Sequence, residues 1–321
     1  MSVLDKLREF TVVVADTGDF ASIKEHRPRD STTNPSLLLA AAQMPEYQHL
    51  VEDALDHCSM DVSDSEQNMR PCLEKLAVNF GKEILAIVPG RVSVEVDATF
   101  SFDTEKTIET ARRIISMFEK DGIDRSRILI KIAATWEGIK AAEQLELENI
   151  HCNLTLLFSF AQAVACVEAK VQLISPFVGR ILDWHKAKEG FDSIPPEEDP
   201  GVLSVKKIYN YYSHFGYKTE VMGASFRNTE EIKELAGCDL LTISPKLLKE
   251  LEEQEGDLPR KLDPSFAHSL KIERISMDEN IFRWMHNEDA MATEKLAEGI
   301  RKFSADLSLL AEYMRAKRLN K

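Results

Sequence analysis

The sequence of 321 residues contains no long hydrophobic run. Its longest apolar stretches are short, such as Leu37–Ala42, whereas a helix needs about 20 apolar residues to cross a bilayer. The first residues already carry the charges of Asp5, Lys6, Arg8 and Glu9, and no apolar segment of a signal peptide follows them. We therefore expect a soluble, cytoplasmic protein that does not bind membranes.

Positive charge and cysteine are also scarce. The 40 Lys and Arg against 54 Asp and Glu give a net charge of −14. This balance argues against binding of nucleic acids or anionic membranes, both of which need a basic surface, although one small basic pocket for an anionic metabolite remains compatible. The five cysteines, at positions 58, 72, 152, 166 and 238, form no CxxC pair. That usage favours reduced, mostly buried thiols over a disulfide framework.

Glycine-rich phosphate loops are absent as well. No GxG and no P-loop pattern occurs anywhere in the chain, which disfavours a doubly wound open sheet, the main alternative fold. Short β-branched apolar runs alternate instead with amphipathic segments such as Asp103–Lys120 and Thr135–Glu148, a pattern typical of parallel strands joined by helices. Eight such runs are the number that closes a (β/α)8 TIM barrel. The candidate strands are Thr11–Thr17, Ser31–Pro35, Arg91–Asp97, Ile128–Ala134, His151–Phe158, Val171–Val178, Lys218–Ser225 and Asp239–Pro245.

Two segments interrupt this alternation. Trp184–Gly201 is rich in proline and charge and is predicted to be a long loop after the sixth strand, and Glu255–Asn287 has irregular composition. Glu288–Arg318 then has the pattern of a long C-terminal helix. No linker marks a second domain, so we expect one domain over 1–321, with the barrel at about 8–254 and an extension with its helix at about 255–321.

Charged residues stand inside three of the apolar strands. Asp16 ends VVVAD, Glu95 lies in SVEVD and Lys131 lies in ILIKIAA. One such residue alone would favour a structural ion pair, but a lysine flanked by two carboxylates near the carboxyl ends of barrel strands favours an active site. A desolvated lysine can form a Schiff base with a carbonyl compound, while carboxylates transfer the protons. No HExxH or His/Cys cluster suggests a metal, and His151 is expected to be structural.

Polar side chains at other strand ends predict a pocket for a phosphorylated sugar. Arg180, Ser225 and Arg227 follow the sixth and seventh strands, where barrels commonly bind phosphate. The alternative is that the arginines pair with surface acids. Sugar-binding candidates are Asn34, Asn153, Thr155 and Ser175, although a cap or turn role is the alternative for Asn34, which precedes a proline.

These motifs together resemble the transaldolase family of the pentose phosphate pathway, in its longer bacterial and eukaryotic form. The resemblance covers Leu4–Leu248 and resumes at KLAEGIRKF near the C-terminus. The motifs that carry it are VVADTGDF, DSTTNPSLLL, VSVEVDA, ILIKIAATWEGI, CNLTLLFSFAQA, LISPFVGRILDW and VMGASFRN.

The resemblance implies a class I aldolase-like (β/α)8 barrel, circularly permuted relative to class I aldolases, with a last helix across the barrel mouth. It implies a homodimer without cofactor or metal. The implied reaction would move a dihydroxyacetone unit reversibly from sedoheptulose 7-phosphate to glyceraldehyde 3-phosphate, giving erythrose 4-phosphate and fructose 6-phosphate.

The same resemblance implies a role for each site residue. Lys131 would form the Schiff base, Asp16 would be the acid/base at the donor C4 hydroxyl, and Glu95 with Thr155 would hold a catalytic water. The substrate-binding residues would be Asn34, Asn153 and Ser175 for the dihydroxyacetone hydroxyls, Arg180, Ser225 and Arg227 for the phosphate, and Phe177 in the pocket wall.

Two rival functions stay open on the sequence. A fructose 6-phosphate aldolase would release free dihydroxyacetone, but that sister group tends to have Gln where this chain has Glu95 and Tyr where it has Phe177. A catalytically silent phosphosugar-binding barrel would not need Lys131 inside a strand, where an apolar residue costs less.

Overall fold

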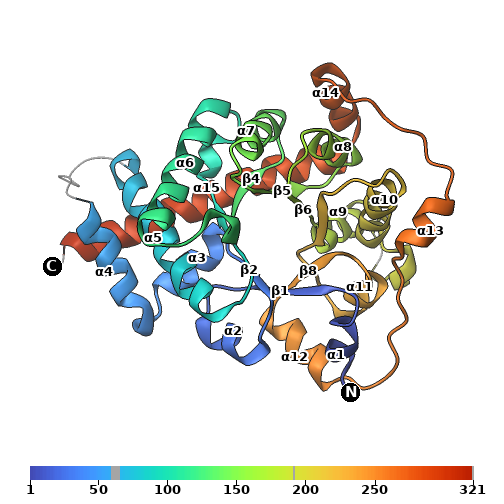
Figure 1. The fold of residues 1–321 in the computed structure, drawn as a ribbon, viewed down its shortest axis with the longest axis horizontal. Coiled ribbons are helices and arrows are strands. Elements are labelled where there is room, and N and C mark those ends of the chain that lie inside the picture. The colour runs from blue at the N-terminus through green and yellow to red at the C-terminus, as the bar shows by residue number, and fades with distance from the viewer. Residues whose placement is uncertain (59–65, 191, 320–321) are drawn as a thin grey trace.

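The strands of the computed structural model, which describes residues 1–58, 66–190 and 192–319, form a closed parallel barrel in chain order (Figure 1). The predicted (β/α)8 barrel is therefore confirmed, and each predicted strand overlaps an observed one. The strands are β1 (Val12–Asp16), β2 (Asp30–Thr32), β3 (Val92–Glu95), β4 (Ile128–Ala133), β5 (Cys152–Leu157), β6 (Leu173–Pro176), β7 (Glu220–Gly223) and β8 (Leu240–Ile243).

Helices surround the strands and cover both the outside and one end of the barrel. Aspartate, serine, threonine and asparagine cap many of them, as at Asp103 before α6 and Thr135 before α7. The helices are α1 (Val3–Leu7), α2 (Phe20–His26), α3 (Pro35–Ala42), α4 (Gln48–His57), α5 (Glu66–Ile87), α6 (Thr104–Lys120), α7 (Trp136–Leu147), α8 (Phe160–Glu168), α9 (Val178–Glu189), α10 (Pro200–His214), α11 (Thr229–Glu234), α12 (Pro245–Glu253), α13 (Pro264–Ser269), α14 (Glu279–Glu288) and α15 (Ala290–Leu319), with short 3-10 turns at Pro45–Tyr47, Ala98–Phe100, Arg125–Arg127 and Pro196–Glu198.

The barrel interior is built in layers. An apolar layer fills its middle and is made by Val14, Leu129, Leu173, Met222 and Leu240. Side chains two residues apart on a strand point to the same side, so the next inward layer along the chain direction consists of the residues two positions later. Four of these five residues are polar, namely Asp16, Lys131, Ser175 and Thr242, and the fifth is Ala224. The alternation of side chains along each strand therefore places a mostly polar layer at the carboxyl ends of the strands.

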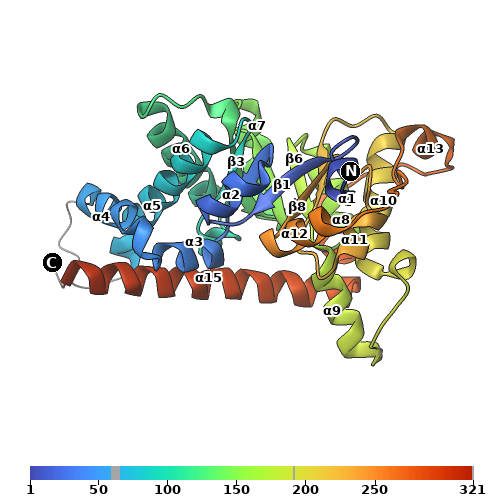
Figure 2. The same cartoon turned by 90° about the horizontal axis from the view of Figure 1, so that it is seen from below.

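The C-terminal helix α15 lies across that end of the barrel (Figure 2). It packs closely on β5 because Gly299 has no side chain: a Cβ there would come 2.6 Å from Leu156 Cδ2. Phe303 of α15 is buried, and its ring centroid lies 5.8 Å from Lys131 Nζ. The predicted helix over the barrel mouth is therefore confirmed.

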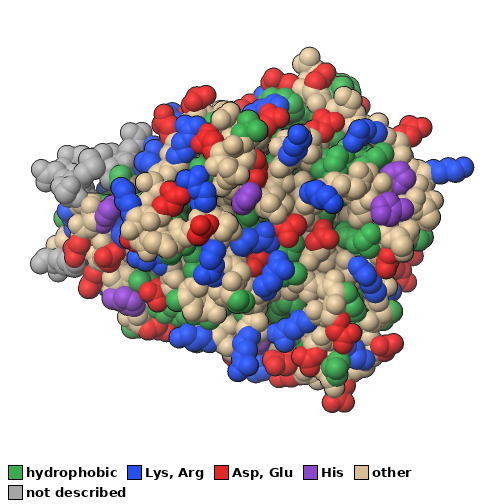
Figure 3. Space-filling model, viewed as in Figure 1, with side chains coloured by type: hydrophobic (Ala, Val, Ile, Leu, Met, Phe, Trp, Pro, Cys, Tyr) green, Lys and Arg blue, Asp and Glu red, His purple; other side chains and the backbone are tan. Residues whose placement is uncertain are grey.

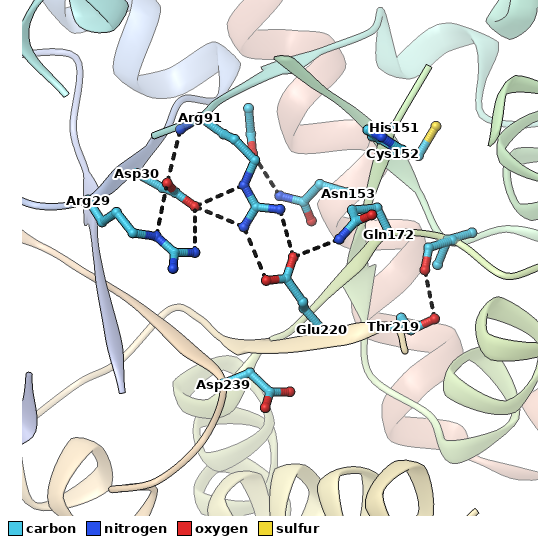
Figure 4. A network of polar contacts seen from close by, with 12 residues as sticks. Arg29, Asp30, Arg91, His151, Cys152, Asn153, Gln172, Thr219, Glu220 and Asp239 are labelled. Carbon is cyan, nitrogen blue, oxygen red and sulfur yellow. Dashed lines mark hydrogen bonds and ion pairs between the residues drawn. The ribbon is translucent and has the colours of Figure 1, made fainter. Parts of the chain in front are cut away.

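A charged network closes the opposite end of the barrel, the barrel floor (Figure 4). The Arg91 guanidinium donates to Asp30 Oδ2 at 2.9 and 3.1 Å and to Glu220 Oε2 at 2.7 Å, and Gln172 Nε2 donates to the same Glu220 oxygen at 3.0 Å. Figure 3 shows this face of the molecule, where basic side chains gather among acidic ones near the centre. Arg91 thus neutralises two carboxylates from different strands.

Replacement of Arg91 by methionine is expected to destabilise the barrel strongly. The side chain of Asp30 is only 5% exposed, and removing one partner of a buried ion pair typically costs about 3–5 kcal/mol. Without Arg91, Asp30 keeps only the longer contact with Arg29 at 3.4 Å, and Glu220 loses its ion pair. Urea unfolding at neutral pH measures the free energy of unfolding. The matched control is Arg112→Met, which removes an exposed pair with Glu148 and should cost less than about 1 kcal/mol. An equal decrease in the free energy of unfolding of Arg91→Met and Arg112→Met would contradict a structural role for the floor network.

The Trp184–Gly201 segment is not the long loop that its composition predicts. α9 continues to Glu189 and ends at Gly190, whose φ of +73° gives the left-handed conformation of a helix C-cap. A 3-10 turn follows, and α10 starts at Pro200 behind the N-cap Asp199. The prolines start these elements instead of marking a loop. Residue 191 lies outside the described residues.

The C-terminal part of the chain agrees better with its pattern. Glu255–Asn287 includes two helices, α13 and α14, between extended segments, so its irregular composition is only partly reflected in its structure. The long C-terminal helix is confirmed as α15, two residues later at its start than predicted. Within the described part of the chain, no helix is long and apolar enough to span a bilayer.

The expectation that all cysteines are reduced is wrong for one pair. Cys58, after α4, and Cys72, in α5, form a disulfide across 14 residues of sequence, a separation that no CxxC search detects. The other three cysteines, Cys152, Cys166 and Cys238, are free and buried, and burial raises the pKa of each thiol. They are therefore poor nucleophiles at neutral pH.

Candidate active site

Lys131 lies in the middle of β4, with only 4% of its surface exposed. Strand register places Glu95 of β3 on one side of it and Asn153 of β5 on the other. Its Nζ lies 3.1 Å from Glu95 Oε2 and donates to the carbonyl of Thr33 at 3.2 Å. A buried amine with one carboxylate partner has the position that a Schiff-base nucleophile needs.

Asp16 ends β1 and belongs to the same polar layer. Its Oδ1 accepts a hydrogen bond of 2.9 Å from Thr32 Oγ1, which is itself 2.8 Å from Thr242 Oγ1. Because the Thr32 hydroxyl donates to Asp16, Thr242 must donate to Thr32. Burial raises the pKa of Asp16 against the opposing effects of Lys131 and Thr32. Burial likewise raises the pKa of Glu95. Both carboxyl groups can therefore take up and release protons next to the amine.

Asn153 connects the polar side chains of three strands. Its Nδ2 donates to Ser93 Oγ at 3.0 Å, and its Oδ1 accepts a hydrogen bond of 2.5 Å from Ser175 Oγ. The three side chains are buried, so their orientation is set before a ligand arrives. They form a hydrogen-bonding wall beside Lys131.

Asn34 and Thr155 belong to β-strand ends near this wall, after β2 and in β5. Asn34 caps α3, because its Oδ1 accepts from Leu37 N at 3.0 Å, and it also lines the cavity described below. The cap role foreseen for Asn34 is therefore confirmed, and it leaves the Asn34 amide group for a ligand. Thr155 follows Asn153 by two residues and is buried, and its Oγ1 has no hydrogen-bond partner among the described protein groups.

Arg180 supplies the positive charge of the site. Its guanidinium lies over the rings of Phe177 at 4.8 Å and Phe303 at 5.6 Å from the centroids. Burial lowers the pKa of Arg180, and the neighbouring Arg227 lowers it further. None of the ion pairs found among the described residues includes Arg180. A half-buried arginine held by aromatic rings and aimed into a cavity is typical of an anion-binding site.

Ser225 and Arg227 follow β7 in the β7–α11 loop, residues 224–228. Ser225 has a φ of +62°, in the left-handed region, and lines the cavity. Arg227 is exposed, and its Nη2 lies 2.6 Å from Asp183 Oδ2 of α9. The alternative that the arginines pair with surface acids therefore describes Arg227 but not Arg180.

One cavity of about 380 Å³ joins these groups. It lies between the polar layer and α15, so it is bounded by strand ends on one side and by Phe303 on the other. Its lining consists of Asp16, Thr32, Asn34, Lys131, Ser175, Phe177, Arg180, Met222, Ala224, Ser225, Thr242 and Phe303. Glu95, Asn153 and Thr155 are buried on the strands next to Lys131. The structure therefore brings all the predicted site residues to one end of the barrel, with Arg227 at the rim.

Besides the apolar Met222 and Ala224 of the cavity lining, sequence reasoning missed four residues of this site. Three of them lie two positions from a charged or apolar residue of the inner layers: Thr32, Thr242 and Ser93. This spacing of two could have predicted that their side chains also point into the barrel. For Phe303 the only signal was its place at the end of KLAEGIRKF, because the position of α15 is what brings it over Lys131. Within the described ranges, no group of three or more His, Cys, Asp or Glu side chains has the arrangement of a metal site.

A lysine between carboxyl groups inside a (β/α)8 barrel, facing an arginine across a small polar cavity, is typical of enzymes that form Schiff bases with phosphorylated carbonyl compounds. The chain belongs to the transaldolase/fructose-6-phosphate aldolase family, whose family model matches residues 13–313.

Several curated proteins named transaldolase are similar to the chain along almost its whole length. The protein from Rattus norvegicus is 60% identical over 306 residues, which cover 95% of this chain and 91% of the rat protein. The protein from Homo sapiens is 58% identical over 320 residues, 99% of this chain and 95% of its own length. The protein from Thermosynechococcus vestitus is 60% identical over 318 residues, 98% of this chain and 81% of its own length.

Proposed function

We propose that the chain is a transaldolase. It transfers a dihydroxyacetone unit from sedoheptulose 7-phosphate to glyceraldehyde 3-phosphate, giving erythrose 4-phosphate and fructose 6-phosphate, in the non-oxidative pentose phosphate pathway. The observation that carries the proposal is the buried Lys131 amine, 3.1 Å from Glu95 and in one cavity with Asp16 and Arg180. The relatives that share about 60% of the sequence and bear this name support it.

The first half of the reaction forms the imine. The Lys131 amine attacks the C2 carbonyl of the ketose phosphate. The resulting carbinolamine takes up one proton from the Glu95 carboxyl, whose pKa burial raises, and loses water to give a protonated imine. Glu95 and Thr155 hold the water that carries protons between the leaving hydroxyl and the amine. The buried positions of Glu95 and Thr155 beside Lys131 support this role.

The second half breaks and forms one carbon–carbon bond. Asp16 takes the proton of the C4 hydroxyl, the C3–C4 bond breaks, and its electron pair moves into the imine to give an enamine. The aldose phosphate leaves as an aldehyde while three carbons stay on Lys131. The acceptor aldehyde then reacts in the reverse direction, with Asp16 returning the proton, and hydrolysis of the imine releases the new ketose phosphate.

Substrate recognition divides between two groups of side chains. The hydroxyls of the dihydroxyacetone part are bound by Asn34, Asn153 and Ser175. Their amide and hydroxyl groups lie close to Lys131, which supports this role. Arg180, Ser225 and Arg227 bind the phosphate. Phe177 supports the Arg180 guanidinium and keeps the neighbouring wall apolar, which limits the access of water to the imine.

A transaldolase and a fructose 6-phosphate aldolase can be distinguished by whether the reaction needs an acceptor aldehyde. With fructose 6-phosphate alone we expect almost no free dihydroxyacetone, and with erythrose 4-phosphate added we expect glyceraldehyde 3-phosphate and sedoheptulose 7-phosphate in equal amounts. Coupled assays that consume NADH measure the free dihydroxyacetone in the first case and the glyceraldehyde 3-phosphate in the second. Dihydroxyacetone released at the same rate without acceptor would assign the chain to the aldolase branch, and no turnover at all would favour the silent barrel.

We also propose a cytoplasmic homodimer. The family resemblance supports the dimer, as do the large apolar side chains Ile281 and Trp284 exposed on α14. The charged phosphate esters it acts on, which do not cross membranes unaided, support the location. Light scattering coupled to gel filtration should give twice the chain mass of 36.3 kDa. Cell fractionation tests the compartment.

A further inference from the structure

Two acidic side chains meet behind the β7–α11 loop, outside the cavity of the reaction. Glu231, the third residue of α11, is 1% exposed, and Asp199, the N-cap of α10, is 2% exposed. A buried carboxyl group is costly unless it is hydrogen-bonded or neutral. Neither group takes part in the proposed reaction.

Glu231 is bonded to the backbone of the loop. Its Oε2 accepts a hydrogen bond of 2.7 Å from the backbone N–H of Arg227, and its own backbone N–H donates to Asn228 Oδ1 at 2.9 Å. Asp199 is bonded to α10 in the same manner, since its Oδ1 accepts from Gly201 N at 2.7 Å. The two carboxyl groups therefore join the loop to the start of α10.

The charges around the pair favour one shared proton. Burial raises the pKa of Glu231 to about 7, and the Asp199 charge adds to that effect. Burial also raises the pKa of Asp199, while a hydrogen bond from the Glu231 side chain lowers it. The neutral Glu231 carboxyl is therefore the donor and Asp199 the acceptor.

Other charged groups face the pair from the elements around it. Lys186 of α9 and Asp192 line the same small cavity as the pair, and Asp183 of α9 raises the pKa of Glu231 by repulsion. Arg227 lowers it, although its guanidinium pairs with Asp183. These charges oppose one another, so the pair is held by its backbone hydrogen bonds and by the proton that its two carboxyl groups share.

The opposite side of the loop is held by the start of α9. Gly179 N donates to the carbonyl of Ser225 at 2.9 Å, and Val178 N donates to that of Ala224 at 2.8 Å. The approach requires a glycine, because a Cβ on Gly179 would come 2.5 Å from the Ser225 carbonyl oxygen. The loop is thus fixed on one side by α9 and on the other by the acid pair.

We propose that Glu231 is a positioning residue, whose carboxyl, hydrogen-bonded to Asp199, holds the β7–α11 loop so that Ser225 and Arg227 meet the phosphate of the substrate. This inference rests on the proposed function, because the proposed function assigns the β7–α11 loop to phosphate binding. Loss of the proton above neutral pH places two carboxylates in contact, which loosens the loop and weakens phosphate binding.

The test compares wild type with Glu231→Gln, which is uncharged at every pH and can still donate to Asp199 and accept from Arg227 N. The readouts are KM for fructose 6-phosphate, with erythrose 4-phosphate as acceptor, and the inhibition constant of inorganic phosphate. From about pH 6 to about pH 8.5 the wild-type KM should rise about tenfold more than that of Glu231→Gln, with kcat changed less than about twofold. The substrate's own ionisation is common to both proteins and cancels in the ratio.

Two further variants separate positioning from general stability. Glu231→Leu, which has no hydrogen bond to offer, should raise KM and the inhibition constant of phosphate about tenfold at every pH, while turnover of unphosphorylated fructose stays as in wild type. Glu230→Gln, a neutralised but exposed neighbour, should match wild type throughout.

Identical pH profiles of wild type and Glu231→Gln would overturn the inference while leaving the proposed function intact. So would a Glu231→Leu variant that loses fructose and fructose 6-phosphate turnover equally, since that is the result of a merely structural role. Absence of turnover in wild type would instead contradict the proposed function itself.

Discussion

Replacement of Lys131 by methionine is expected to reduce kcat by about 10⁵-fold or more, as in other enzymes that lose a covalent nucleophile. Methionine has nearly the same length and fits the apolar surroundings of β4, so the fold should persist. Glu95 loses its cation, but because burial raises its pKa it can take up a proton and stay neutral. Circular dichroism and thermal unfolding check the fold, and the coupled assay measures the rate.

The same residue can be identified directly by trapping. Borohydride added to wild-type protein with fructose 6-phosphate should leave a stable three-carbon adduct on the peptide that contains Lys131, as determined by mass mapping. Lys131→Met should give no adduct. Lys140→Met, a control at a lysine half exposed on α7 and paired with Glu143, should react like wild type. An adduct on another lysine, or activity retained in Lys131→Met, would disprove the assignment of the nucleophile.

Replacement of Asp16 by asparagine is expected to lower kcat by about 10²- to 10⁴-fold, the contribution of a well-placed acid/base. Asparagine keeps the shape of the side chain and can still accept the hydrogen bond of Thr32, but it cannot take the proton of the C4 hydroxyl. The imine can still form, so borohydride should still label Lys131, now with the uncleaved six-carbon donor. Labelling of Lys131 that persists while turnover is lost is the result that we expect specifically from the loss of the acid/base Asp16.

Asp19→Asn provides the matched control three residues further along. Asp19 caps α2 and bonds Tyr47, and asparagine is an equally good helix cap, so both stability and rate should stay close to wild type. A three-carbon adduct at the wild-type rate in Asp16→Asn would show that another group accepts the C4 proton, with Glu95 as the next candidate.

The barrel was predictable from the sequence because each strand is buried on both faces. ILIKIA in β4 and CNLTLL in β5 leave no exposed side chain, so they stand out as apolar runs, and a charge within one is conspicuous. Parallel strands end on the same side, which is why Asp16, Glu95 and Lys131 could be expected to meet. The division of residues into one domain over 1–321, and the role of each site residue, stay predictions.

What the sequence could not show depends on contacts between distant segments. Phe303 reaches Lys131 only because Gly299 allows α15 to approach β5. Asp183 turns Arg227 toward the rim from a neighbouring helix. The Cys58–Cys72 disulfide joins the C-cap of α4 to α5, and no local motif around either cysteine predicts the pairing. Threonines in strands are common, so the period of two is only a weak signal for Thr32 and Thr242, and their role becomes visible when their hydroxyls are seen in line with Asp16.

The position of α15 has a consequence for biosynthesis. This helix follows every strand in the chain, so a growing polypeptide completes the barrel and its polar layer before the helix that covers them leaves the ribosome. During that interval we expect Lys131 to be open to water and to any aldehyde or ketone of the cell. Translation of the last helix therefore also ends the period in which the nascent chain is open to unwanted carbonyl adducts at its own nucleophile.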